Sequence, residues 1–131
     1  MSNKLTRYKK VEDWLCDYID QAFNDDIVCD KEFTGEAKES RAIYIESIKD
    51  GFDDQSTSAE YTIGFTASTK KRSDAVRTIS MLESLFPVYN KKIGRGLAIS
   101  INMQYITTPL RTIIDSKSVY LVSATLVALT T

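Results

Sequence analysis

The side chains that could do chemistry in this sequence are carboxylates, lysines, tyrosines and two cysteines. The 131-residue chain contains no histidine, which excludes Ser-His-Asp triads, Cys-His pairs and imidazole metal ligands. Two close carboxylates can act as a general acid and base. The acidic residues form three groups, namely Glu12/Asp13/Asp17/Asp20, Asp25/Asp26 and Asp53/Asp54. The first group falls on the polar side of a predicted helix and the others flank turns, so we predict that the protein is not an enzyme.

The two cysteines, Cys16 and Cys29, do not form a CxxC pair. Without histidine, a structural zinc site would need both distant thiols and carboxylates, which is an improbable ligand set. We therefore expect two buried free thiols in a reducing compartment, because free cysteine is among the most buried residue types. No metal and no cofactor are predicted.

Glycines and basic residues suggest two further kinds of site. Gly94-Arg95-Gly96 is similar to part of a glycine-rich phosphate-binding loop, but neither GxGxxG nor GxxxxGK[ST] is present and the segment precedes a strand. We interpret it as a turn. The runs Lys70-Lys71-Arg72 and Lys91-Lys92 could form one basic patch with Arg95. Nucleic-acid-binding domains usually combine a basic excess with interleaved aromatic residues, whereas the formal net charge here is −1. We therefore interpret these basic residues as solvated ends of loops. We predict that the protein does not bind a specific nucleic-acid sequence.

Length and composition indicate one ordinary globular domain, residues 1–131. The chain is 43% hydrophobic and 27% charged, and a domain of this size buries roughly two-thirds of the surface that its unfolded chain exposes. The N-terminal residues lack the apolar core of a signal peptide. No apolar run approaches the ~20 residues that span a bilayer. We expect a soluble protein made in the cytoplasm, with no membrane partner.

The first half of the chain shows one helix followed by strands. Apolar residues from Leu5 to Phe23 recur at helical spacing, which predicts an amphipathic helix. Short strands are expected at 27–29 and 41–48, with polar loops at 30–40 and 51–58. Residues Ala59–Thr69 alternate strictly between apolar and polar, which is typical of a half-buried strand in an antiparallel sheet.

The second half predicts another helix and two more strands. Ser73 is the expected N-cap of the helix and Asp74 lies in its first turn. Pro87 ends it, with Met81 and Val88 on its outer side. Its predicted buried stripe is Ala75, Ile79, Leu82, Leu85, Phe86 and Tyr89. A strand at 97–105 and a loop at 107–118 follow. The last strand, at 119–129, is apolar on both faces, as a central strand or an interface strand would be.

The resulting order, α-β-β-β-α-β-β, predicts an α+β domain with a mixed or antiparallel sheet and two helices packed on it. Five of the seven tyrosines fall at core-facing positions, namely Tyr8, Tyr18, Tyr61, Tyr89 and Tyr105. Tyr44 and Tyr120 belong to strands with two apolar faces. They are candidates for the core or for an interface, where tyrosine is enriched.

This layout resembles the tail-terminator proteins of long-tailed bacteriophages, also called tail-completion or minor capsid proteins. The resemblance covers nearly the whole chain as an order of elements. The closest local likeness is the loop with TTPL at 107–110, which precedes a long terminal strand. The resemblance implies a homohexameric ring that caps the tail tube and joins it to the head connector. It implies tail-tube and head-completion proteins as partners, and a location in the virion after assembly in the host cytoplasm.

A ring of this kind would form by heterologous association, in which one surface packs on a different surface of the neighbouring copy. We expect the ends of the second helix and the strand edges to make subunit contacts. The loops around Asp53 and at 107–118 would meet the tube or connector. The candidate interface residues are Asp53, Asp54, Lys70, Lys71, Arg72, Met81, Val88, Arg111, Asp115, Lys117 and Tyr120.

Two other classes of function remain open at this point. The first is a monomeric protein-binding module of the immunity or adaptor type, which would occlude a partner protein. The second is an enzyme that uses lysine, tyrosine or carboxylates, for which a deep pocket with two or more buried titratable groups would be the mark.

Overall fold

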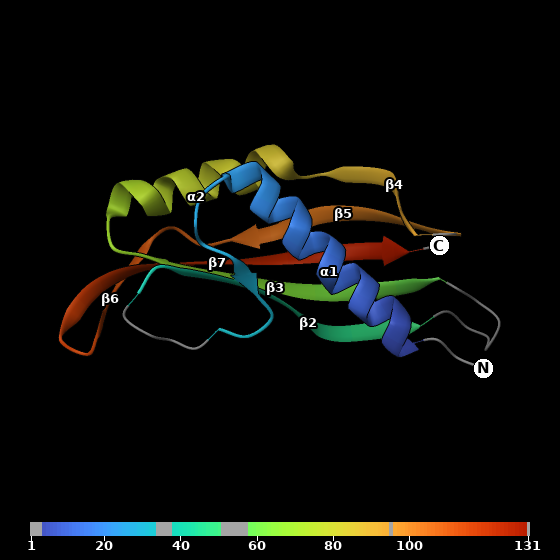
Figure 1. Cartoon of the computed structure of the whole chain (residues 1–131), viewed down its shortest axis with the longest axis horizontal. Helices are drawn as coiled ribbons and strands as arrows, with labels where there is room; N and C mark the ends of the chain where they lie inside the picture. Colours follow the sequence, from blue (N-terminus) through green and yellow to red (C-terminus); the bar gives the residue numbers. More distant parts are fainter. Residues whose placement is uncertain (1–3, 34–37, 51–57, 95, 131) are drawn as a thin grey trace.

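The chain folds into two layers, with both helices on one face of a single sheet (Figure 1). The computed structural model describes residues 4–33, 38–50, 58–94 and 96–130. The elements are α1 (Lys4–Phe23), β1 (Cys29–Asp30), β2 (Ser40–Asp50), β3 (Ala59–Thr69), α2 (Arg72–Leu85), β4 (Val88–Gly94), β5 (Leu97–Ile106), β6 (Leu110–Ile114) and β7 (Lys117–Thr130).

The sheet has seven strands in the order β1-β2-β3-β7-β5-β4, with β6 paired to β7. All pairs are antiparallel except β1 with β2, which are parallel. The C-terminal strand β7 therefore lies at the centre of the sheet, between β3 and β5. The core-facing side chains Val122, Ala124, Leu126 and Ala128 are buried, whereas Leu129 on the other face is 54% exposed.

Strands β5, β6 and β7 together form one long, interrupted hairpin. β5 and β6 both pair with β7, and Thr107 bridges the gap between them. Its N–H donates to the Ser123 carbonyl over 2.9 Å, while its Oγ1 accepts from the Ser123 N–H over 3.0 Å. Asp115 and Ser116 close the hairpin with φ of 51° and 63°. Positive φ at both central residues is the requirement of a type I′ turn, which suits the twist of paired strands.

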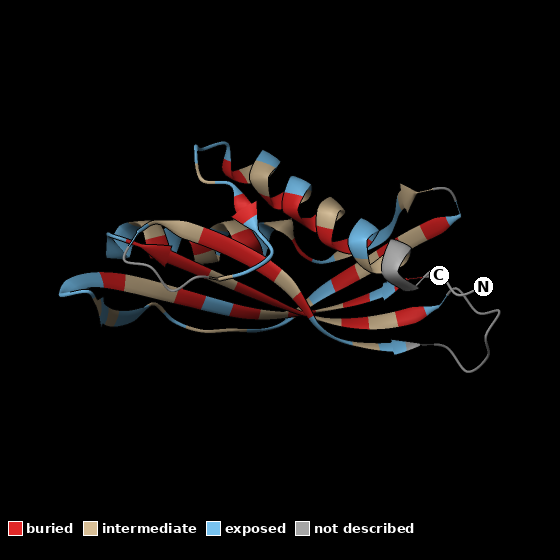
Figure 2. Ribbon diagram, turned by 60° about the horizontal axis from the view of Figure 1, so that its bottom comes forward, coloured by how far each residue is buried: buried red, intermediate tan, exposed pale blue. Residues whose placement is uncertain are grey.

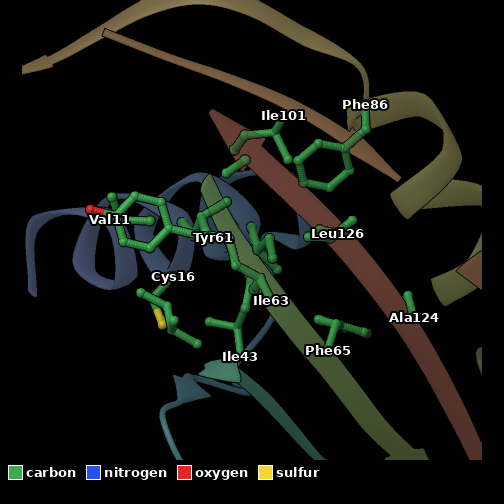
Figure 3. Packing of buried hydrophobic residues seen from close by; sticks show 14 of the residues in the cluster. Val11, Cys16, Ile43, Tyr61, Ile63, Phe65, Phe86, Ile101, Ala124 and Leu126 are labelled. Carbon is green, nitrogen blue, oxygen red and sulfur yellow. The ribbon is translucent and has the colours of Figure 1, made fainter. Parts of the chain in front are cut away.

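The hydrophobic core lies between the helices and the sheet (Figure 3). β3 supplies Tyr61, Ile63 and Phe65, each at most 1% exposed. Leu15 of α1 and Leu126 of β7 are fully buried as well. Alternate residues along each strand face this core, because successive side chains of a strand point to opposite faces. Neither α1 nor α2 lies on the opposite face of the sheet (Figure 2).

The predicted fold class and element order are confirmed, and the structure adds two strands. The helix predicted at Leu5–Phe23 is α1, and the strand predicted at Ala59–Thr69 has the same bounds as β3. No strand was predicted directly after Pro87, but Val88–Gly94 forms β4 at the edge of the sheet. The segment 107–118 was predicted to be a loop, and it contains β6 and the start of β7. The strand expected at 27–29 is limited to Cys29–Asp30.

The predicted cap of the second helix was wrong. α2 begins at Arg72, its N-cap is Lys71, and no side chain caps it. The Lys71 carbonyl instead accepts from the N–H groups of Asp74 and Ala75 and from the Thr69 hydroxyl. Ser73 thus lies within the first turn of the helix, where its hydroxyl does not set the boundary.

Two of the five tyrosines predicted for the core are exposed. Tyr89 is 73% exposed because α2 ends at Leu85, so the helical spacing that placed Tyr89 on the buried stripe no longer applies. Tyr105 is 62% exposed because the pairing of β5 with β7 shifts between Met103 and Tyr105. A bulge of this kind changes which face a residue occupies, and Ile106 packs against the core instead.

Candidate interaction surface

The two cysteines are the first of the residues that could do chemistry. Cys16 and Cys29 are both free and buried, and the Cys29 thiol donates to the Asp30 carbonyl over 3.8 Å. Interaction between the two thiols lowers the pKa of Cys16 and raises that of Cys29, which burial raises further. The predicted buried thiols are therefore confirmed, and their contact with each other was not foreseen. Among the described residues, no group of cysteine and carboxylate side chains is arranged to hold a metal ion.

The acidic residues near the end of α1 serve the fold. Asp25 accepts two hydrogen bonds from Arg41, which hold the pKa of its carboxyl below the usual value. Asp13 pairs with Lys31 and raises the pKa of that amine through their hydrogen bond. Asp53 and Asp54 lie outside the described residues. Asp13 and Asp25 are thus each paired with a basic side chain.

The described residues of the glycine-rich and basic segments lie in separate parts of the fold. β4 ends at Gly94 and β5 begins at Leu97, with Gly96 in the turn at φ 69°. Arg95 lies outside the described residues. One basic run, Lys70, Lys71 and Arg72, is exposed at the start of α2. The other, Lys91 and Lys92, is exposed on β4, which follows the C-terminal end of α2. The 14 residues of α2 span roughly 20 Å, which separates the two runs.

One edge of the sheet, along β2, is covered by other parts of the fold. An edge strand presents unpaired N–H and C=O groups that can pair with another chain, and natural proteins usually protect them. β1 pairs with the Arg41–Ala42 part of β2. Farther along, Glu12 accepts from the Ile45 N–H over 3.3 Å, and the Tyr8 hydroxyl donates to the Ile45 carbonyl over 3.3 Å. Side chains of α1 thus occupy the backbone groups of this edge.

The edge along β4 is protected in another way. Its pairing with β5 shifts register twice, and Lys91 and Lys92 are exposed along it. Bulges and lysines are both common means of preventing edge-to-edge pairing. β4 is therefore a poor template for an added strand.

The edge along β6 is open. β6 pairs only with β7 in the described sheet. Opposed residues in an antiparallel pair alternate between bonded and non-bonded positions, so every second residue of β6 directs its backbone N–H and C=O away from β7. Leu110 and Ile113 are 62% and 70% exposed. We call residues 110–121, the hairpin formed by β6 and the start of β7, the hairpin arm. It projects from one end of the sheet (Figure 1).

A groove lies on the strands at the opposite end of β7. It has a volume of about 380 Å³, is formed by β3, β4, β5 and β7, and we call it the sheet groove. Its apolar lining residues that are not part of the core are Tyr89, Val127 and Leu129, whereas Ile101 is buried and Val88 and Met103 pack against the core. Tyr89 and Leu129 are 73% and 54% exposed. Glu60, Asn102 and Gln104 add polar groups to the lining. Exposed apolar side chains that gather in one concave surface are typical of interaction sites.

The structure brings several of the predicted interface residues together. Arg111, Asp115, Lys117 and Tyr120 all belong to the hairpin arm, where Arg111 is opposite Tyr120. Met81 and Val88 were expected on the outer side of the second helix, and this prediction was wrong. Both pack against the core, and Val88 belongs to β4 because α2 ends before it.

Sequence reasoning missed the apolar members of both surfaces. Leu110 and Ile113 were overlooked because the segment containing Pro109 was interpreted as a loop. The dipeptide Asp115-Ser116 could have indicated a hairpin turn in this segment, since Asp tolerates positive φ in tight turns. Tyr89 was placed in the core by extending the helix beyond Pro87.

No protein-family model matches the chain, and no curated protein matches it. No helix in the part of the chain that the structure describes has the length and apolar character needed to cross a membrane.

Proposed function

We propose that this chain is a structural subunit that assembles with copies of itself into a ring, as a tail terminator does, and has no catalytic role. In that role the ring would cap a phage tail tube and join it to the head connector. The observation that carries the self-assembly is the open edge of the hairpin arm, which presents Leu110 and Ile113 to solvent. The edge of β2 is covered at Arg41–Ala42 and at Ile45, and that of β4 carries register shifts and lysines, whereas β6 has neither kind of protection.

A second observation supports a ring over a two-fold dimer. The hairpin arm and the sheet groove differ in shape and chemistry, and they lie at opposite ends of β7. Two different surfaces that meet between copies make a heterologous contact, which closes into a ring when the rotation between copies permits it. The link to a phage tail rests on the resemblance of the element order and of the TTPL segment before the terminal strand.

Light scattering over a concentration series tests the assembly. We expect a mass several times that of the 14.8 kDa chain, either alone or after mixing with tail-tube subunits. A chain that stays monomeric at every concentration, with and without those subunits, would contradict the proposal. A monomer that instead binds one unrelated protein tightly would favour an adaptor or immunity protein.

A further inference from the structure

We propose that the hairpin arm of one copy docks in the sheet groove of the next copy. This inference rests on the ring assembly proposed above and specifies its contact surfaces. The partner of each surface is therefore a second copy of this chain.

The chemistry of the two surfaces is complementary. The arm offers two exposed aliphatic side chains, Leu110 and Ile113, beside free backbone N–H and C=O groups. The groove offers an apolar lining together with the exposed amides of Asn102 and Gln104. An amide side chain can both donate and accept hydrogen bonds, so it can satisfy the backbone groups of an edge strand. The apolar lining can cover Ile113 at the same time, while Leu110, three residues away on β6, points to the opposite face of the strand.

The charges of the two surfaces are also opposite. Arg111 and Lys117 are exposed on the arm, on either side of the turn that contains Asp115. The groove is lined by one carboxylate, that of Glu60. Opposite charges across a contact favour one register and one partner. A positively charged arm is therefore better matched to this groove than to a second arm.

The geometry excludes docking within one chain. β7 spans 14 residues, which at ~3.3 Å per residue places its two ends roughly 40 Å apart. The arm is at one end of this strand and the groove at the other, and both are parts of the same sheet. An arm can therefore reach only the groove of another molecule. Each copy has one arm and one groove, so the contact propagates from copy to copy.

Complementary defects test the docking directly. Ile113→Asp places a charge on the arm, and Leu129→Asp places one in the groove. Both side chains are more than half exposed, so the monomer is expected to stay folded, which circular dichroism checks. Each variant alone should be monomeric, while wild type assembles. An equimolar mixture of the two should give a heterodimer and nothing larger, because the first variant keeps its groove and the second keeps its arm.

Val28→Asp is the matched control, since Val28 is 75% exposed and belongs to neither surface. It should assemble like wild type. A charge-reversal pair gives a milder second test, in which Arg111→Glu and Glu60→Arg each weaken assembly about tenfold or more. Mixing these two should restore the contact between a reversed arm and a reversed groove.

The outcomes separate this inference from the ring proposal. If wild type assembles and both single variants assemble equally well, the docking is wrong and the ring proposal stands. If both variants are monomeric but their mixture contains no heterodimer, the two surfaces do not contact each other and the docking is also wrong. If wild type itself is always monomeric, the ring proposal fails and the docking fails with it.

Discussion

Arg41 holds Asp25 through two hydrogen bonds, with donor–acceptor distances of 2.7 and 2.9 Å. The same guanidinium group donates to the Ile27 carbonyl and lies 4.3 Å from the centroid of the Phe23 ring. Arg41 itself is only 4% exposed. This arrangement fixes the segment between α1 and β1 against β2. The edge of β2 is therefore covered by a segment that a buried cation holds in place.

The first prediction concerns the pH dependence of this ion pair. Arg41 lowers the pKa of Asp25 from its ordinary value of 3.8. A depressed pKa in the folded state contributes stability above the unfolded value, and that stability is lost as the pH falls through the folded value. Asp25→Asn should therefore lower the free energy of unfolding by about 2 kcal/mol at neutral pH. Urea unfolding at neutral and at strongly acidic pH measures the difference.

The control for this prediction is Asp26→Asn, because Asp26 is exposed and next in sequence. It should change the free energy of unfolding by less than about 0.5 kcal/mol. An Asp25→Asn variant whose loss of stability is the same at acidic and neutral pH would show that the ion pair is not the cause.

The second prediction concerns the protection of the β2 edge by Glu12. This side chain is 8% exposed and accepts from the Ile45 N–H. Its removal leaves a buried N–H group without a partner, which costs about 1–3 kcal/mol. Glu12→Ala should lose that much stability, and amide hydrogen exchange at Ile45 should become faster. Asp17→Ala on the exposed side of α1 is the control and should change neither quantity. Unchanged exchange at Ile45 in Glu12→Ala would contradict the assignment.

Local periodicity predicted the elements that face the core, and it failed where the chain departs from a single period. β3 and α1 were predicted with nearly their observed bounds because each keeps one spacing throughout. β4 was missed because helical spacing was extended across Pro87. β6 was missed because its two faces are both partly exposed, so it shows no alternation.

The interaction surfaces were only partly foreseeable for the same reason. Arg111, Asp115 and Lys117 were singled out as charged residues in a long segment without periodicity. Their apolar neighbours Leu110 and Ile113 look like ordinary core residues in the sequence. They are exposed because the hairpin arm projects from one end of the sheet, and the local spacing of residues does not encode that position.

The third prediction concerns the reactivity of the paired thiols. Cys16 and Cys29 are each 7% exposed, and a thiol must be accessible as its thiolate to react. Both should react slowly with iodoacetamide in the native protein and rapidly in denaturing guanidinium chloride. Because interaction between the two thiols lowers the pKa of Cys16 and raises that of Cys29, the first alkylation should occur at Cys16. Peptide mass spectrometry after partial labelling identifies the site. Preferential labelling of Cys29 would contradict this order of the two pKa values.

The last prediction concerns the contact between Tyr44 and Gly64 on the uncovered face of the sheet. These residues are opposite each other in β2 and β3. A Cβ atom on Gly64 would lie 2.6 Å from Cε2 of Tyr44 and 2.7 Å from Oε1 of Glu46. The tyrosine ring therefore occupies the space that a side chain at 64 would need. Gly64→Ala should cost about 1–3 kcal/mol, the usual range for overpacking, as measured by urea unfolding.

The cause can be isolated by a double-mutant cycle. Glycine within a strand is otherwise unfavourable by roughly 0.5–1 kcal/mol relative to alanine. Once Tyr44→Ala removes the ring, Gly64→Ala should therefore become neutral or stabilising, because the Glu46 carboxylate is the end of a flexible side chain and can move away. The sign of the effect thus reverses between the two backgrounds. If Gly64→Ala destabilises the protein equally with and without the Tyr44 ring, the strain lies elsewhere than in this contact.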